Sequence, residues 1–298
     1  RHRVIAADGS VTPYDRLVIA TGSHPFILPV PGHKLKGVLS FRDIADVEKM
    51  ISASKQFKHA VVIGAGLLGL EAAMGLKTRG MNVTVVHSNH IPLNRQLDQE
   101  AGSLLQQALT EKGLQFKMNT KTAQILGNEQ GQVCGIQFED GSELETELVI
   151  MAIGIRPNMQ LATDAGLYCE KGIVVSDTLQ TYDPRIYALG ECIQHRGDTF
   201  GLVAPLYDQA KVLANHLCEH GVARYHTLPT ATKLKVTGIN LFSVGNYSGG
   251  EGTEKIVFRD ESEQIYKKLI IQNDRLIGAV LYGDTQDGAF YNELLDQA

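Results

Sequence analysis

Hydrophobic positions between residues 60 and 86 form two short apolar runs that flank a glycine-rich turn and an amphipathic segment. Residues 60–63 and 83–86 are rich in β-branched side chains and too short for helices, which is typical of strands buried on both faces. Residues 70–80 have the spacing of a helix. This order, completed within about 28 residues, predicts a βαβ unit and therefore a parallel sheet.

The pattern that follows predicts the rest of this domain. A second helix is expected over residues 98–112, because its apolar residues have helical spacing and Gly113 ends it. A strand follows around residues 114–118. Residues 122–147 instead alternate as short strands separated by glycines, which predicts an antiparallel unit lying on the parallel one. The apolar run 148–154 closes the domain.

Further elements are predicted on both sides of this domain. Residues 17–20 form an apolar run that indicates a buried strand, and residues 42–51 have helical spacing. Strands are expected at 172–175 and 186–189, and a helix from near Pro205 to about residue 216. The tail alternates as a separate α+β unit that ends in a short helix near 287–295. Its expected strands are 234–239, 255–260, 266–272 and 276–283.

Composition narrows the possible classes of protein. The chain has 298 residues, which at about 150 residues per domain predicts roughly two domains. Apolar residues make up 43%, charged residues 20%, and the net charge is −5. These values exclude a disordered polyelectrolyte and a strongly basic nucleic-acid binder. No apolar run approaches the length of a membrane span. We therefore expect neither nucleic acid nor membrane as a partner.

The chain has four cysteines, and no two of them form a CxxC pair. This pattern favours neither a disulfide framework nor a zinc site, and it is typical of the reducing cytoplasm. We expect no metal ligands in the chain.

The turn between the first predicted strand and helix carries the clearest chemistry. Gly64, Gly66 and Gly69 form G-x-G-x-x-G, and Leu67 and Leu68 lie in the turn between the last two glycines. The first glycine allows a tight turn, the second lets a pyrophosphate approach the backbone, and the third lets the helix pack closely on the sheet. The free N–H groups at the helix start would then bind the phosphates. The alternative is a structural turn that binds nothing.

The acidic residue that usually binds an adenosine ribose is absent from its expected position. An acid is expected about 20 residues after the motif, but the second strand ends in His87-Ser88-Asn89-His90. No arginine stands there for a 2′-phosphate, although Arg95 follows, and His87 or His90 would add charge if protonated. Both histidines are equally consistent with exposed loop positions. The choice between NADH and NADPH stays open.

A second candidate site lies near residue 190. Glu191 follows Gly190 at the end of an apolar strand, where open α/β sheets bind ligands, and its carboxylate can accept a hydrogen bond from a sugar or ribityl hydroxyl. Pro205 suits the first turn of a helix, whose positive N-terminus would stabilise an anionic flavin ring. The alternative for Glu191 is a helix cap.

Four ordered segments resemble the FAD-dependent pyridine nucleotide–disulfide oxidoreductase superfamily, in its ferredoxin and rubredoxin reductase-like branch. They are YDRLVIATGS at 14–23, VVIGAGLLGLE at 61–71, MAIGIRPN at 151–158 and IYALGE at 186–191, where Glu191 replaces the usual Asp. Three more are similar to the flavoprotein portion of the large subunit of NAD(P)H nitrite reductases, a group within that superfamily. They are NRQLD at 94–98, ALGECIQHRG at 188–197 and GLVAPLYDQAKVLA at 201–214.

The resemblance implies an α/β fold with Rossmann-like doubly wound nucleotide-binding domains and a C-terminal α+β interface domain. The implied divisions are residues 1–35 as a partial FAD-binding domain, 36–154 as the NAD(P)-binding domain, 155–225 as the FAD-binding domain continued, and 226–298 as the interface domain. It implies FAD contacts from Thr21, Gly22, Gly190 and Glu191, with Ala204 and Pro205 beside the flavin, and nicotinamide nucleotide contacts near Glu71 and Gly154.

The implied activity is hydride transfer from NAD(P)H to FAD, followed by electron transfer to iron–sulfur and sirohaem centres on downstream domains or to a small electron-transfer protein. No catalytic side-chain triad is needed, because the cofactors carry the chemistry. The family's first FAD-binding βαβ unit has no counterpart here, so we expect this chain alone to hold FAD poorly. The resemblance of the tail to the family's interface domain adds a homodimer to the expected partners. The alternatives are a free-standing rubredoxin or ferredoxin reductase and a non-catalytic NADH-binding module.

Overall fold

Two units make up the chain, and each is assembled from two stretches of sequence. Unit 1 comprises Arg1–His24 and Ile155–Leu228, and unit 2 comprises Pro25–Gly154 and Pro229–Ala298. The computed structural model describes residues 2–218, 221–227, 231–236 and 238–296. The four-part domain division drawn from the sequence stays a prediction.

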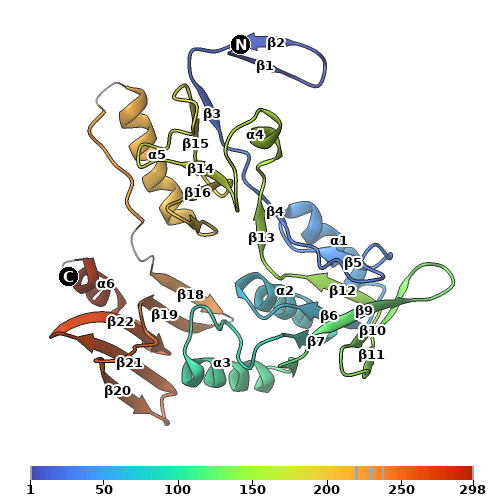
Figure 1. Cartoon of the computed structure of the whole chain (residues 1–298). Helices are drawn as coiled ribbons and strands as arrows, with labels where there is room; N and C mark the ends of the chain where they lie inside the picture. The colour runs from blue at the N-terminus through green and yellow to red at the C-terminus, as the bar shows by residue number, and fades with distance from the viewer. Residues whose placement is uncertain (1, 219–220, 228–230, 237, 297–298) are drawn as a thin grey trace. The chain divides into compact units, whose positions relative to one another are not determined.

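Unit 2 contains the parallel sheet that the sequence predicts (Figure 1). Its strand order is β5-β12-β6-β7-β8, and every neighbouring pair is parallel. The strands are β5 Val38–Ser40, β6 His59–Ile63, β7 Asn82–Val86, β8 Gln115–Lys117 and β12 Leu148–Met151, and the helices are α1 Ile44–Ser54, α2 Leu67–Thr78 and α3 Gln99–Glu111. This arrangement confirms the predicted α/β class.

Both faces of this sheet are covered, which explains its uninterrupted apolar strands. Val62 packs in the core formed with α2 and α3, whereas its neighbours Val61 and Ile63 pack in a second core on the other face. That second face is covered by an antiparallel sheet of β9 Thr122–Gly127, β10 Val133–Phe138 and β11 Glu143–Glu145. The predicted antiparallel unit therefore lies on the parallel sheet.

Helix α3 begins and ends where the sequence indicates. Its N-cap is Asp98, whose side chain accepts a hydrogen bond from the Ala101 N–H at 3.1 Å, and Gly113 follows its end with a φ of +88°. An aspartate N-cap and a left-handed glycine after the last turn are strong helix boundaries. The same aspartate accepts hydrogen bonds from the Tyr266 hydroxyl and the Lys268 ammonium group. Asp98 therefore also fastens the C-terminal sheet to α3.

The C-terminal part of unit 2 is a five-stranded antiparallel sheet of order β18-β19-β22-β21-β20, followed by α6. The elements are β18 Thr232–Val236, β19 Ile239–Gly245, β20 Glu254–Asp260, β21 Ile265–Gln272, β22 Arg275–Tyr282 and α6 Gly288–Asp296. The prediction of one strand over residues 234–239 was wrong. The chain reverses there, because β18 pairs antiparallel with β19 around Gly238, whose φ is +93°. Residue 237 lies outside the described residues.

Unit 1 contains short strands packed beneath helix α5 (Figure 1). Strand β3 pairs in parallel with β15, and β14 pairs in parallel with β16. The elements are β1 Arg3–Ile5, β2 Val11–Pro13, β3 Leu17–Ile19, β4 Ser23–Pro25, β13 Ile155–Pro157, α4 Gln160–Asp164, β14 Ile173–Val175, β15 Ile186–Ala188, β16 Ile193–His195, β17 Asp198–Thr199 and α5 Val203–Leu217. Their core includes Ile19, Tyr187, Ile193 and Leu213.

The strand expected at residues 17–20 is present as β3, but the expectation that it is buried was wrong for most of its residues. Only Ile19 is buried, whereas Val18 is 39% exposed and Ala20 is exposed. Among the described residues β3 has one strand neighbour, β15, so the structure covers it less than the interior strands of unit 2. An apolar run alone does not report how many neighbours a strand has.

Candidate functional site

The glycine-rich turn of unit 2 leaves the start of α2 open to a ligand. The helix has Gly66 as its N-cap, no side chain caps it, and its first turn carries no acid. The first backbone hydrogen bond runs from the Leu70 N–H to the Gly66 carbonyl at 3.0 Å. Leu67 and Leu68 therefore occupy the first helical positions, where backbone N–H groups have no partner within the helix. Together with the positive end of the helix dipole, these groups favour an anion such as a phosphate.

Packing within the protein explains two of the three glycines of the motif but not the third. A Cβ on Gly64, whose φ is +110°, would lie 2.3 Å from the Ala152 carbonyl oxygen, and one on Gly69 would lie 2.0 Å from the Gly64 carbonyl oxygen. Packing therefore requires these two. A Cβ on Gly66 would meet nothing within 4 Å, and the backbone there is extended, with φ −79° and ψ −175°. A glycine that the protein's own packing does not require fits a nucleotide pyrophosphate that approaches the backbone.

Gly154 and Glu71 lie on elements that border this turn. Strand β12 pairs with β6, so residues that follow β12 reach the same edge of the sheet as the glycine turn. Gly154 lies three residues beyond β12, and a side chain there would meet nothing within 4 Å. Glu71 lies on α2 and is exposed. The structure thus places Gly154 at the sheet edge that carries the glycine turn, whereas Glu71 lies on the helix that begins there.

His87 directly follows β7 at the same edge and is half-buried. Its Nδ1 lies 3.4 Å from the Ala65 nitrogen, and its Nε2 lies 3.1 Å from Oδ1 of Asn94. Because the Ala65 N–H donates to Nδ1, the proton of a neutral ring lies on Nε2 and is donated to Asn94. Burial lowers the pKa of His87. A lowered pKa favours the neutral imidazole over a charged ring that would attract a 2′-phosphate.

The other two residues considered for binding a 2′-phosphate are His90 and Arg95, and their surroundings differ from those of His87. His90 is exposed. Arg95 lines an open recess of about 580 Å³ on the C-terminal sheet, together with Asn246 and Tyr247, and its carbonyl oxygen accepts a 2.5 Å hydrogen bond from the Tyr247 hydroxyl.

Unit 1 brings together four of the residues predicted to contact FAD. Since β3 and β15 are parallel neighbours, the residues that follow them meet at one edge. The Ser23 hydroxyl donates to Oε2 of Glu191 at 2.6 Å, and the Thr21 hydroxyl donates to the Asn158 carbonyl oxygen at 2.5 Å. The Asn158 N–H in turn donates to the Gly22 carbonyl oxygen at 2.8 Å. Thr21, Gly22, Gly190 and Glu191 therefore form one cluster.

This cluster has room for a ligand. Side chains at Gly22 and Gly190 would meet no protein atom within 4 Å, so the space beside both residues is open. Glu191 does not cap α5, because that helix has Leu202 as its N-cap and no side-chain cap. A carboxylate oriented by Ser23 beside open space fits the hydroxyl-rich ribityl chain of FAD.

The first turn of α5 contains Ala204 and Pro205, as predicted, although the helix begins two residues before Pro205, at Val203. Gln209, one turn later, is fully buried, and its Oε1 accepts a 2.8 Å hydrogen bond from the Gly190 N–H. This link joins α5 to the Gly190–Glu191 turn. The sequence analysis missed Gln209. The available signal was a polar residue at helical spacing from Leu206 and Leu213, on the face of α5 that packs on the core.

The described ranges contain no cluster of three or more His, Cys, Asp or Glu side chains placed to hold a metal. Within the same ranges no helix is long and apolar enough to cross a membrane.

Comparison with known proteins decides the family. A family model described as pyridine nucleotide-disulphide oxidoreductase matches residues 1–212, and one described as rubredoxin NAD+ reductase C-terminal domain matches residues 230–298. The chain belongs to the pyridine nucleotide-disulphide oxidoreductase family. This membership confirms the predicted family and, with the solved relatives, the cofactor pair of FAD and a nicotinamide nucleotide.

Individual relatives show which members of this family the chain is similar to. The nitrite reductase [NAD(P)H] of Bacillus subtilis (strain 168) is 48% identical over 285 residues, which are 96% of this chain and 35% of that protein. The assimilatory nitrate reductase electron transfer subunit of the same organism is 44% identical over 287 residues, which are 96% of this chain and 37% of that protein. The chain thus spans little more than a third of the length of these curated relatives.

Among solved structures, the ferredoxin reductase for the CYP199A2 system from Rhodopseudomonas palustris matches with a TM-score of 0.88 at 27% identity. The match covers 99% of this chain and 74% of that one.

Proposed function

We propose that this chain is the segment of a nitrite reductase-type flavoprotein that takes hydride from NAD(P)H and passes electrons onward through FAD. One observation carries the proposal. Gly66 stands at the uncapped start of α2 with open space where a side chain would be, and nothing in the protein's own packing requires glycine there. The identity of 48% to a nitrite reductase [NAD(P)H] supports the specific class.

FAD, when bound, supplies the capacity to accept a hydride and to release electrons singly. The chain's own residues bind and orient. The start of α2 would bind the pyrophosphate of the nicotinamide nucleotide, and His87, held by Asn94, would lie beside its adenosine ribose. Glu191, held by Ser23, would accept hydrogen bonds from the ribityl hydroxyls. The positive N-terminus of α5, at Ala204 and Pro205, would stabilise negative charge on the flavin ring.

The onward acceptor is proposed from the relatives. Since the chain spans about a third of a nitrite reductase, we infer that electrons pass to iron–sulfur and sirohaem centres on downstream domains of a longer polypeptide in the cytoplasm. Release to a small electron-transfer protein is the second candidate, and the match of residues 230–298 to a rubredoxin reductase C-terminal domain favours it. A homodimer formed through the C-terminal sheet is compatible with both.

Anaerobic addition of NADH tests the proposal in the FAD-loaded protein, prepared as the longer polypeptide that the proposal describes. We expect the flavin absorbance near 450 nm to bleach, and addition of an iron–sulfur acceptor to restore it. Binding of NADH without bleaching would contradict the proposal and support a nucleotide-binding module without redox chemistry. Replacement of NADH by an equal concentration of NAD+ is the control.

A further inference from the structure

Strand β20 lies at one edge of the C-terminal sheet and carries exposed bulky apolar side chains. Among the described residues it pairs with β21 alone (Figure 1). Ile256, Val257 and Phe258 are 58%, 42% and 54% exposed. Because successive side chains of a strand point to opposite faces, this edge of the sheet is apolar on both faces. An exposed apolar edge strand is a template on which another strand can pair.

The outer side of β20 also offers backbone hydrogen-bonding groups. The strand pairs with β21 along its whole length, from Glu254 opposite Ile271 to Asp260 opposite Ile265. In an antiparallel pair, alternate residues direct their N–H and C=O groups to the neighbouring strand, so the other residues direct theirs outward. Within the described part of the chain, no segment except β21 supplies backbone partners to this strand. An incoming strand can therefore hydrogen-bond along this side.

The charged residues of β20 have a mirror order around the apolar centre. From Glu254 to Asp260 the strand reads acid, base, three apolar residues, base, acid. At one end, the Arg259 guanidinium donates to Oε2 of Glu100 at 2.9 Å, and Oδ1 of Asp260 accepts hydrogen bonds from the turn that follows. At the other end, Glu254 and Lys255 have no side-chain hydrogen bond or ion pair to any described residue. These two charges are available to a partner.

This order disfavours pairing of β20 with the same strand of a second copy. In an antiparallel pair with Val257 opposite Val257, Lys255 would face Arg259 and Glu254 would face Asp260. Like charges directly opposite each other destabilise a sheet. A shift by two residues would instead place charged side chains opposite apolar ones. The complementary strand has the order base, acid, three apolar residues, acid, base, and the mirror order makes it match in either direction.

We propose that β20 is a docking edge for a separate protein, which adds one extended strand of this complementary order to the C-terminal sheet. The backbone of the added strand binds the outward N–H and C=O groups, and its apolar centre covers residues 256–258. Its two acids face Lys255 and Arg259, and its two bases face Glu254 and Asp260. None of these residues belongs to either candidate cofactor site, so the proposal is independent of the proposed function.

Two fluorescein-labelled heptapeptides of identical composition test the proposal on the full-length protein. KEVIVEK has the complementary order, and EKVIVKE has the charge order of β20 itself. We expect KEVIVEK to bind at least tenfold more tightly in fluorescence anisotropy, because four opposite-charge pairs replace four like-charge pairs. We also expect KEVIVEK to slow hydrogen exchange of the outward amides of residues 254–260 about tenfold. Equal affinities, or binding without this protection, would overturn the proposal.

A charge swap on the protein provides the matched variant. Glu254→Lys combined with Lys255→Glu reverses the order at one end of β20, at two exposed positions, and should reduce the difference between the peptides to about threefold or less. Glu48→Lys with Lys49→Glu, also exposed neighbours, is the control and should leave it unchanged. Slow exchange of residues 254–260 in the peptide-free protein, or a dimer abolished by the first swap, would show that its own chain or a second copy occupies the edge. Either result overturns the separate partner.

Discussion

The two candidate sites are built in contrasting ways. The nucleotide site of unit 2 comes from one continuous βαβ stretch, in which β6, the glycine turn, α2 and β7 follow one another from His59 to His87. The flavin-side site of unit 1 is assembled from residues near 21, 158, 190 and 209, which only the pairing of β3 with β15 and the packing of α5 bring together. A continuous site can be recognised from spacing, whereas an assembled one depends on contacts that spacing does not encode.

The largest expected effect is on the continuous site. Gly66→Val should weaken NADH binding roughly a hundredfold or more, because its side chain would occupy the space through which the pyrophosphate reaches several backbone N–H groups. The fold should survive, since nothing lies within 4 Å of the added Cβ. Titration with NADH measures the affinity, and circular dichroism monitors the fold.

Gly75→Val is the matched control for this change. Gly75 lies on the same helix, and a side chain there also meets open space. Unchanged NADH affinity in Gly66→Val, or equal losses in both variants, would remove the pyrophosphate assignment.

The assembled site should be less sensitive to single changes, because several segments share its contacts. In the FAD-loaded protein, Glu191→Gln should weaken FAD binding about tenfold through loss of charge-assisted hydrogen bonds to ribityl hydroxyls. Ser23→Ala should have a smaller effect in the same direction, since it only releases the Glu191 carboxylate. Fluorescence titration with FAD measures both. A larger loss in Ser23→Ala than in Glu191→Gln would contradict the assigned roles.

The preference for NADH or NADPH tests the role of the residues that follow β7 in the continuous site. We expect the ratio of kcat/KM to favour NADH over NADPH by about tenfold, because residues 87–90, directly after β7, contain no arginine and the lowered pKa of His87 favours its uncharged form. His87→Arg should reduce or reverse this preference, and His90→Arg, at an exposed position, is the comparison. A strong preference for NADPH in the unsubstituted protein would instead implicate Arg95 or a protonated histidine.

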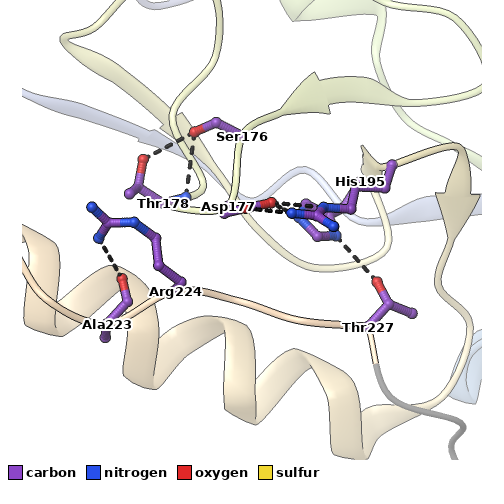
Figure 2. Close-up of polar contacts among 8 residues, drawn as sticks. Ser176, Asp177, Thr178, His195, Ala223, Arg224 and Thr227 are labelled. Atoms are coloured by element: carbon purple, nitrogen blue, oxygen red, sulfur yellow. Dashed lines mark hydrogen bonds and ion pairs between the residues drawn. The ribbon is translucent and has the colours of Figure 1, made fainter.

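The smallest expected effect concerns stability in unit 1. The folded pKa of Asp177 is lowered by its hydrogen bonds from Arg196 and His195 (Figure 2), so below about pH 4, near the value for an unfolded aspartate, the unfolded chain binds more protons than the folded one. The stabilisation by Asp177 is therefore complete above that pH and is lost as the pH falls through the folded pKa. Thermal unfolding of Asp177→Asn against the unsubstituted protein should show a difference in Tm that shrinks with acidification. A difference independent of pH would show that the carboxylate charge is not responsible.

Local sequence signals were sufficient to predict much of the fold. The βαβ unit, a helix over residues 98–112 and the apolar run 148–154 that contains β12 were predicted, because helix caps, the apolar period and burial in a parallel sheet all act within a few residues. The strand predictions were wrong where the structure of a segment depends on the strands with which it pairs. Residues 234–239 read as one strand but reverse at Gly238, and the apolar run 17–20 is half exposed for lack of a second neighbour.

The sequence by itself determined the glycine turn before α2, the family and the cofactor pair, because glycine spacing and short ordered motifs carry that information in contiguous residues. Only the tertiary structure decided that Gly66 alone of the motif glycines is free of the protein's own packing, that His87 is half-buried and bonded to Ala65 and Asn94, and that Gln209 holds the Gly190 N–H. Burial and hydrogen bonding between residues far apart in the chain depend on how the elements pack, and packing has no signature in the spacing of one segment.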